Sequence, residues 1–531
     1  MGGQDQKSLV VYRTKRACAL VVAALVVAGC STADVDAPLE ASSEAPLSIS
    51  QDDDSQVDSP PDAYGTSVAP AVPEATFTSE PLPPAASYAI VPQQCERRYL
   101  CATLEVPADH GNPEAGSITL ELGMLPASDE DRRIGVLLVN PGGPGQGMDG
   151  FLDYGAGLSP DVLNRFDVVG WNPRGVTADT APDCEDEAEE LQFIGALSDT
   201  PDNEARIAEV AKQAAESCLA GLSGREHLIG TVQTVHDMDL IRQALGEEQI
   251  SYLGYSYGTI LGQFYSDLYG PNARAVVLDG VMDSSLSHED LLVGQILGFA
   301  RVTDEVFAAC RQDSACPTVG DPKDAYFKLM KRLESEPLLN SAGEVVAGPG
   351  HATVALASVS YASKEAWWIL YEAFSEALDG NGEKMRELAW SYTRSSGGLG
   401  PFFSIGCTDS GRISEDDLNR LVGRMTEVAG EFGRAAAAEA RMCAYWSETK
   451  PRPHRAISAP DAPPVLVVGN RGDSATPYEW AVAVAESLDT GVLLTYNGQG
   501  HTSYGRNSCV DEIVDDYLIN LTMPPNGTEC G

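Results

Sequence analysis

The segment Ile250-Ser251-Tyr252-Leu253-Gly254-Tyr255-Ser256-Tyr257-Gly258-Thr259 decides the fold that the sequence predicts. A short β-type run leads into Gly-x-Ser-x-Gly, and apolar residues at helical spacing follow it. In this strand–turn–helix context, a sharp turn exposes the serine hydroxyl at the edge of a parallel sheet. The turn needs small residues two positions before and two positions after the serine, and both are glycine. Ser256 is therefore the candidate nucleophile.

Other apolar runs place this segment within a larger sheet. The continuous run at 134–139 has the pattern of a strand buried on both faces, and similar runs alternate with helical patterns around it. Such alternation predicts an α/β fold with a doubly wound, mostly parallel sheet. From 281 to 445 the alternation stops and helical periodicity dominates, which predicts an inserted helical lid domain. We expect this lid to divide the core into 95–280 and 446–531.

A nucleophilic serine needs a base that accepts its proton and an acid that orients the base. In this type of fold they follow the serine in the order Asp or Glu, then His, each after a strand. Asp473 and His501 follow the predicted strands at 464–469 and 491–496, so we expect them to meet Ser256 at one edge of the sheet. Asp279 also ends a strand and is the alternative acid, with a helix cap or loop hydrogen bond as its other possible role. Six further histidines fit the base role less well, because they precede the serine or fall in the lid and its connections: His110, His227, His236, His288, His351 and His454.

An oxyanion hole requires two backbone N–H groups close to the nucleophile. One comes from the residue that follows the serine, which is Tyr257. The other is expected from Gly143, because a Gly-Gly turn after the strand at 134–139 lets the main chain approach a substrate closely. A simple tight turn is the alternative interpretation of this glycine pair.

The N-terminal segment has the features of an export signal. Basic residues precede an apolar run, Ala17–Ala28, that is too short to span a bilayer. The run ends in Val-Ala-Gly-Cys, which resembles a bacterial lipobox and predicts a signal peptide at 1–29 with lipidation of Cys30. An ordinary signal peptide is the alternative. The acidic, Pro- and Ser-rich segment 30–94 is predicted to be a disordered tether, so we expect an exported protein that is membrane-anchored or secreted.

The net charge of −43 over 531 residues excludes a typical nucleic-acid-binding protein, which carries a basic face. It would also repel anionic lipid, so we expect contact with a membrane only through the N-terminal anchor. The sequence has no Cys-x-x-Cys and no His-x-x-x-His spacing, and we expect neither a metal site nor a cofactor. We expect a monomer.

The cysteine count also favours an exported protein. Cys18 lies within the signal and Cys30 at the proposed anchor, which leaves an even number in the remainder. An even number of cysteines in an exported chain suggests disulfides, although their connectivity does not follow from sequence. Pairing of sequence neighbours gives modest separations and is our hypothesis. It would join Cys95–Cys101, Cys184–Cys218, Cys310–Cys316, Cys407–Cys443 and Cys509–Cys530.

Several motifs together resemble the secreted tripeptidyl aminopeptidases of actinobacteria, which are relatives of prolyl iminopeptidase in the α/β-hydrolase superfamily. The resemblance covers roughly 95–530, with small departures at Gln146-Gly147-Met148 and Asn172. The matching segments are Asn-Pro-Gly-Gly-Pro-Gly (140–145), Phe-Asp-Val-Val-Gly-Trp-Asn-Pro-Arg-Gly (166–175), Gly-Tyr-Ser-Tyr-Gly-Thr (254–259), Leu-Asp-Gly-Val (278–281), Gly-Asp-Ser-Ala-Thr-Pro (472–477) and Gly-His-Thr (500–502).

This resemblance implies an α/β-hydrolase fold and an exopeptidase that removes short peptides, tripeptides foremost, from the free N-termini of peptides or proteins. It implies Ser256 as nucleophile, Asp473 as orienting acid and His501 as base. Such an enzyme must also recognise the ammonium group of its substrate, for which a carboxylate in a water-excluded cleft is suited. Asp409 is our candidate for that role, and a solvated loop aspartate is the alternative interpretation.

Two other functions are compatible with the same residues. An esterase or lipase would use the same triad, because substrate choice depends on the lid pocket rather than on the fold. A non-catalytic binding lipoprotein that kept the fold would be expected to lack at least one member of the triad, and none is missing here. A serine exopeptidase is the prediction that the residues favour.

Overall fold

The computed structural model describes residues 90, 92–96, 99–148, 150, 157–395 and 397–531. The predicted signal peptide, Cys30 and all of the predicted tether up to residue 89 lie outside the described residues. The first described strand begins at Gln93, close to the expected start of ordered structure at Cys95. Within the described ranges, no helix is long and apolar enough to cross a membrane.

A ten-stranded sheet organises the described chain, in the order β1-β2-β3-β5-β4-β6-β7-β10-β11-β12. The pairs from β5 to β12 along this order are parallel, and the three pairs at the other end are antiparallel. This is the α/β-hydrolase architecture that the sequence predicts. The strands are β1 (Gln93–Glu96), β2 (Tyr99–Pro107), β3 (Ser117–Leu125), β4 (Gly135–Asn140), β5 (Phe166–Trp171), β6 (Ile250–Tyr255), β7 (Ala273–Asp279), β10 (Val465–Gly472), β11 (Gly491–Gln499) and β12 (Thr528–Cys530), with a separate hairpin of β8 (Leu338–Leu339) and β9 (Val345–Ala347).

The continuous apolar runs are explained by burial on both faces of the sheet. In β4, Leu138 packs into one hydrophobic cluster, whereas its neighbours Leu137 and Val139 pack into another on the opposite face. Helices α5, α6 and α14 contribute to the first cluster, and α2 and α15 contribute to the second. The helices that cover the sheet are α2 (Pro160–Arg165), α5 (Thr231–Ala244), α6 (Tyr257–Tyr269), α14 (Tyr478–Ser487) and α15 (Ser508–Asn520).

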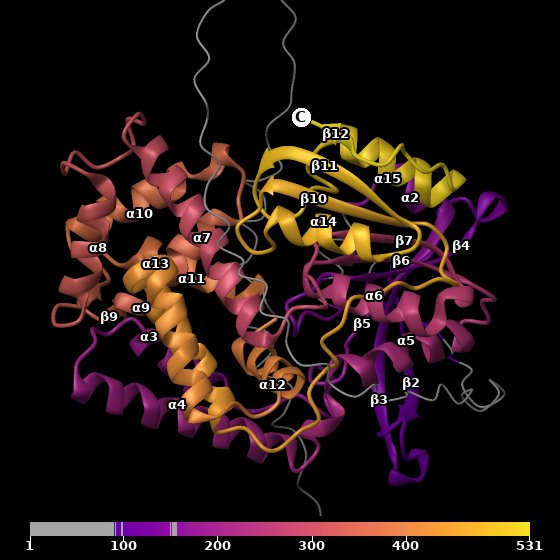
Figure 1. Cartoon of the computed structure of the whole chain (residues 1–531), viewed down its shortest axis with the longest axis horizontal. Coiled ribbons are helices and arrows are strands. Elements are labelled where there is room, and N and C mark those ends of the chain that lie inside the picture. The colour runs from indigo at the N-terminus through magenta and orange to yellow at the C-terminus, as the bar shows by residue number, and fades with distance from the viewer. Residues whose placement is uncertain (1–89, 91, 97–98, 149, 151–156, 396) are drawn as a thin grey trace, which may run out of the picture. The chain divides into compact units, whose positions relative to one another are not determined.

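Helices fill the segment between β7 and β10, where the sequence predicts the lid. They gather on one side of the sheet in Figure 1 and share a hydrophobic core of their own. Two helices from before the nucleophile strand, α3 (Glu185–Ile194) and α4 (Pro201–Leu222), also pack against them. The helices of the lid are α7 (His288–Cys310), α8 (Pro322–Leu333), α9 (Pro349–Ser360), α10 (Trp368–Leu378), α11 (Glu383–Ser395), α12 (Leu399–Ser410) and α13 (Glu415–Ala444).

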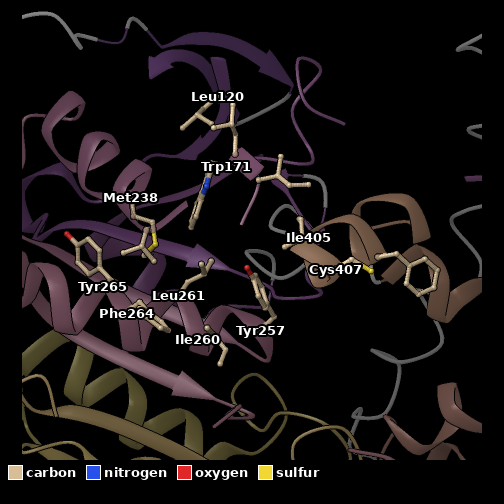
Figure 2. Packing of buried hydrophobic residues seen from close by; sticks show 14 of the residues in the cluster. Leu120, Trp171, Met238, Tyr257, Ile260, Leu261, Phe264, Tyr265, Ile405 and Cys407 are labelled. Atoms are coloured by element: carbon tan, nitrogen blue, oxygen red, sulfur yellow. The ribbon is translucent and has the colours of Figure 1, made fainter. Parts of the chain in front are cut away.

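The lid and the core share one hydrophobic cluster. Figure 2 shows Tyr257 at the start of α6 together with Ile405 and Cys407 of α12, and all three belong to the cluster that covers the sheet. Helix α12 therefore packs directly on the segment that carries the candidate nucleophile.

Among the described residues there are five disulfide bonds, and they are the same pairs of sequence neighbours that we expected. Most of them tie elements that the sheet alone does not hold together: Cys184–Cys218 joins the start of α3 to α4, and Cys407–Cys443 joins α12 to α13. The other three are Cys95–Cys101, Cys310–Cys316 and Cys509–Cys530.

Candidate active site

Ser256 lies in a sharp turn between β6 and α6. Its backbone has φ 52° and ψ −121°, a conformation that residues other than glycine rarely adopt and that marks a strained turn. A Cβ at Gly258 would lie 2.7 Å from the carbonyl oxygen of Asn140, and one at Gly254 would lie 2.5 Å from the carbonyl oxygen of Gly258. Only glycine fits at both positions, which explains the Gly-x-Ser-x-Gly spacing. The turn holds Ser256 at the carboxyl end of the central strand.

His501 and Asp473 are brought together at the same edge of the sheet. The two carboxylate oxygens of Asp473 lie 3.0 and 2.9 Å from Nδ1 of His501. The carboxylate also accepts hydrogen bonds from the backbone N–H groups of Ala475 and Thr476 and from the Thr476 hydroxyl, at 2.8 to 2.9 Å. Burial raises the pKa of Asp473, but His501 and these donors outweigh it and hold the pKa below its usual value. Asp473 is therefore an ionised acid that orients a histidine.

Asp279, the alternative acid, has different partners. Its carboxylate accepts from the backbone N–H groups of Ser503 and Tyr504 at 2.9 and 2.8 Å, and it makes no hydrogen bond to His501. Its backbone carbonyl accepts from the N–H of Ser256 at 3.0 Å. Burial raises the pKa of Asp279 to about 6. Asp279 thus fixes the loop that follows His501, which is the loop hydrogen-bonding role the sequence left open for it.

Ser256 and His501 line one cavity between the sheet and the lid. The cavity volume is about 270 Å³, roughly twenty times the ~10–15 Å³ that one water needs. The Nε2 atom of His501 is buried and has no hydrogen-bond partner among the described residues. Because Nδ1 is held by Asp473, Nε2 is the nitrogen that remains available to exchange a proton in the cavity.

The turn after β4 also borders the nucleophile. A Cβ at Gly142 would lie 2.6 Å from the carbonyl oxygen of Tyr255 and 3.2 Å from the backbone nitrogen of Tyr257, so only glycine permits this approach. The Gly142 N–H donates to Oδ1 of Asn140 at 3.0 Å. Gly143 lines the cavity beside Ser256 and Tyr257. Of the two glycines, Gly143 is therefore the one placed to offer its N–H to a bound group.

Three of the other histidines have surroundings that differ from those of His501. His110 bonds to Asp237 at 2.7 Å, which in turn pairs with the fully buried Arg174. His288 and His454 line the cavity, but burial lowers the pKa of each to about 4, so they are neutral near pH 7. Across the described residues, no cluster of three His, Cys, Asp or Glu side chains could hold a metal ion.

Asp409 lies at the end of α12 and lines the cavity, so the interpretation as a solvated loop aspartate does not apply. Its carboxylate accepts from the backbone N–H and the hydroxyl of Thr231, at 2.8 and 2.5 Å, and from the Tyr257 hydroxyl at 3.4 Å. Burial raises the pKa of Asp409, and the nearby charge of Arg452 opposes that shift. The carboxylate is thus already partnered within the protein.

Glu439 and Gln192 also line the cavity and were not singled out from the sequence. Glu439 is one of several glutamates on the long amphipathic helix α13, and Gln192 lies in α3, before the nucleophile. No local pattern distinguishes them from solvated helix residues. Their position becomes visible only when α3 and α13 pack together.

Comparisons with known proteins identify relatives of this chain. Residues 428–530 match the family model described as TAP-like protein. Serine protease Hip1 of Mycobacterium tuberculosis is 32% identical over 466 residues, covering 81% of this chain and 87% of that protein. Carboxylesterase B of the same species is 32% identical, covering 81% and 86%. Tripeptidyl aminopeptidase of Streptomyces lividans is 28% identical, covering 81% and 84%.

Proposed function

The chain belongs to the α/β-hydrolase family that includes serine protease Hip1 and the tripeptidyl aminopeptidases, and it is a serine hydrolase; on that premise, we propose that it is an extracytoplasmic serine exopeptidase. It releases short peptides, tripeptides foremost, from the free N-termini of peptides or proteins. Substrates are therefore polypeptide N-termini and not nucleic acids.

The observation that carries this proposal is the arrangement of His501. Its Nδ1 is held by the ionised Asp473, and its Nε2 is buried without a partner among the described residues, in the cavity that Ser256 lines. This is the arrangement of a general base that accepts a proton from a serine hydroxyl. Asp473 is the orienting acid in this mechanism, and Asp279 has a positioning role.

The reaction proceeds through an acyl-enzyme. Ser256 Oγ attacks the scissile carbonyl carbon while Nε2 of His501 takes its proton, and the backbone N–H groups of Tyr257 and Gly143 stabilise the oxyanion. Collapse breaks the C–N bond, and His501 passes the proton to the leaving amine. A water molecule then attacks the acyl carbon, gives its proton to His501, and releases the peptide acid while Ser256 regains its proton.

Export and anchoring form part of the proposal. The five disulfides support an oxidising compartment, because such bonds are rare in the reducing cytoplasm. We infer that 1–29 directs export, that Cys30 carries the lipid, and that 30–94 tethers a monomeric enzyme to the membrane. Replacing Cys30 with Ala and measuring release of the enzyme into the medium tests the anchor.

An esterase is the second candidate, favoured by one observation. Carboxylesterase B has the same 32% identity to this chain as serine protease Hip1 has. An ester has no N-terminal ammonium group, so the two functions differ in what the cavity must recognise.

Three substrates distinguish the candidates. A chromogenic tripeptide amide with a free amine, its N-acetylated twin and a short-chain ester would be given to the wild-type chain and to Ser256→Ala. Cleavage of the free-amine peptide in preference to its acetylated twin, abolished by the substitution, is expected for an exopeptidase. Hydrolysis of the ester with both peptides untouched would refute the peptidase and favour the esterase.

A further inference from the structure

The cavity wall that α3 and α13 form is lined mainly by small apolar side chains. Ala435, Ala436 and Ala438 of α13 lie there, and a Cβ at Gly195 would lie 2.9 Å from the Ala438 Cβ, so the two helices approach closely. Glu439 is the acidic side chain that α13 places in this lining. A carboxylate in such surroundings is costly to keep ionised unless it meets a positive charge.

The part of the chain that the structure describes supplies no such charge. Among the described residues, no lysine, arginine or histidine lies within ion-pair distance of Glu439. The arginines of the same helix are engaged elsewhere: Arg441 pairs with Glu204, and Arg434 pairs with Glu204 and Glu431. Burial accordingly raises the pKa of Glu439 to about 7. The carboxylate lies in the cavity wall without a cation.

Gln192 provides a second unsatisfied group beside it. Its Oε1 accepts from the Thr393 hydroxyl at 3.3 Å, which fixes the orientation of the amide. Its Nε2 is buried and makes no well-formed hydrogen bond among the described residues, although the Gln192 amide lies close enough to Glu439 to lower the pKa of that carboxyl. Buried donors without partners are rare in folded proteins and require an explanation. An acceptor with a negative charge and a donor thus lie together in the cavity lining.

This pair matches the free end of a peptide. An N-terminal residue presents an ammonium group and, three bonds further on, a carbonyl oxygen. Asp409, the acid first predicted to bind the ammonium, differs from Glu439 in having partners within the protein. Its oxygens already accept from Thr231 and Tyr257, and the positive charge of Arg452 lies near it. Its contact with Tyr257 suits a positioning role for the nucleophile turn.

We propose that Glu439 binds the terminal ammonium group of the substrate and that Gln192 donates to the adjacent carbonyl oxygen. This inference rests on the proposed exopeptidase function. Ser256 and His501 come from the sheet edge, whereas Glu439 and Gln192 come from α13 and α3.

The test compares Glu439→Gln with Glu427→Gln, which removes an exposed glutamate from the same helix. Both variants, the wild-type chain and Asp409→Asn would be assayed at pH 8 with the free-amine tripeptide amide, its N-acetylated twin and the short-chain ester. Thermal unfolding of each variant verifies that it is folded. The readout is kcat/KM for the free-amine peptide divided by that for the ester.

Glu439→Gln is expected to lower this ratio about ten- to hundredfold through KM, since a charge-assisted hydrogen bond is lost. Gln192→Leu is expected to lower it about three- to tenfold, and Glu427→Gln leaves it at the wild-type value. Asp409→Asn is expected to slow peptide and ester alike, because it acts on the nucleophile turn.

A wild-type ratio in folded Glu439→Gln, or a rise in KM confined to Asp409→Asn, would overturn the inference while the exopeptidase stands. A wild-type enzyme that cleaves the ester but neither peptide would overturn the proposed function itself, and the inference with it.

Discussion

Two carboxylates show how differently the two walls of the cavity are built. One wall is the edge of the sheet, and the other is the helical wall that α3 and α13 form. At the edge of the sheet, Asp473 has a histidine and three further close donors, and these partners hold its pKa below the usual value. In the helical wall, Glu439 has no cation within reach among the described residues, and burial raises its pKa to about 7. The first carboxylate is stabilised by several partners, whereas the second has only the Gln192 amide beside it.

This difference indicates that the sheet edge acts on the substrate without rearrangement, whereas the helical wall is completed by the charge of the substrate. Groups that must act in the same geometry at every turnover are held by the protein beforehand, because misplacement costs rate. Groups that select a ligand are instead left short of a partner, which the correct ligand supplies and a wrong ligand does not.

The largest effects are expected at the sheet edge. Ser256→Ala and His501→Ala should each lower kcat on peptide and ester by about 10⁴- to 10⁶-fold, because both steps of the reaction pass through these side chains. Steady-state kinetics with active-site titration measures this loss. Ester hydrolysis that persisted at the wild-type rate in Ser256→Ala would show that another group attacks.

The two aspartates of this edge should differ in how much kcat falls when each is replaced. Asp473→Asn is expected to lower kcat about 10⁴-fold, because the amide no longer holds the correct tautomer of His501. Asp279→Asn should cost about tenfold or less, since an amide oxygen still accepts from the backbone N–H groups of Ser503 and Tyr504. Equal losses in the two variants would mean that Asp279 shares the role of the acid.

Removing the disulfide Cys407–Cys443 should disturb the helical wall more than removing Cys310–Cys316. Cys407 and Cys443 join α12 to α13 across 36 residues and both line the cavity, whereas Cys310 and Cys316 are six residues apart. Replacing both Cys407 and Cys443 with Ala should cost about 3–4 kcal/mol of unfolding free energy and raise KM for the free-amine peptide.

The matched control replaces Cys310 and Cys316 with Ala and should lower only the stability, by about 2 kcal/mol on the same loop-entropy argument. Denaturant unfolding and KM are measured on both proteins. An unchanged KM after loss of Cys407–Cys443 would contradict the view that this bond shapes the recognition wall.

The smallest effect concerns stability and pH. The pKa of Glu439 is about 7 in the folded protein, whereas its ordinary value is 4.5. Between pH 4.5 and pH 7 the folded state therefore keeps a proton that the unfolded state has lost. The stabilisation from the protonated form is complete below about pH 4.5 and is lost as the pH rises through 7. Glu439→Gln mimics that form, so its Tm should exceed that of the wild type by roughly 1–3 °C at pH 8 and equal it at pH 4.5. A gap of the same size at both pH values would argue against a buried acid.

The sheet and the residues at its edge could be predicted because their signals are local. Strands buried on both faces are continuous apolar runs, and the residues after parallel strands meet at one edge. Ser256, Asp473 and His501 were therefore placed without any knowledge of contacts. The choice between Asp473 and Asp279 needed coordinates, because both follow a strand and only a distance to Nδ1 of His501 separates them.

The recognition wall could not be predicted in the same way. Glu439 lies on a helix rich in glutamate, and its neighbours in the cavity come from α3, more than 200 residues away in sequence. The sequence instead predicted Asp409 for this role, since nothing local reveals that Thr231 and Tyr257 already bond to it. Partners brought together by helix packing leave no periodic or spaced pattern.

The position of the lid between β7 and β10 has an evolutionary consequence. These two strands are neighbours in the sheet, so the lid departs from one strand and the chain returns to the adjacent one without altering their register. Mutations within 281–445 that keep the contacts of Tyr361 with His501 and of Asp409 with Tyr257 can thus accumulate while the strands of the sheet stay paired. A lineage could exchange one substrate for another by remodelling this single stretch of its gene while it inherits the hydrolytic machinery intact.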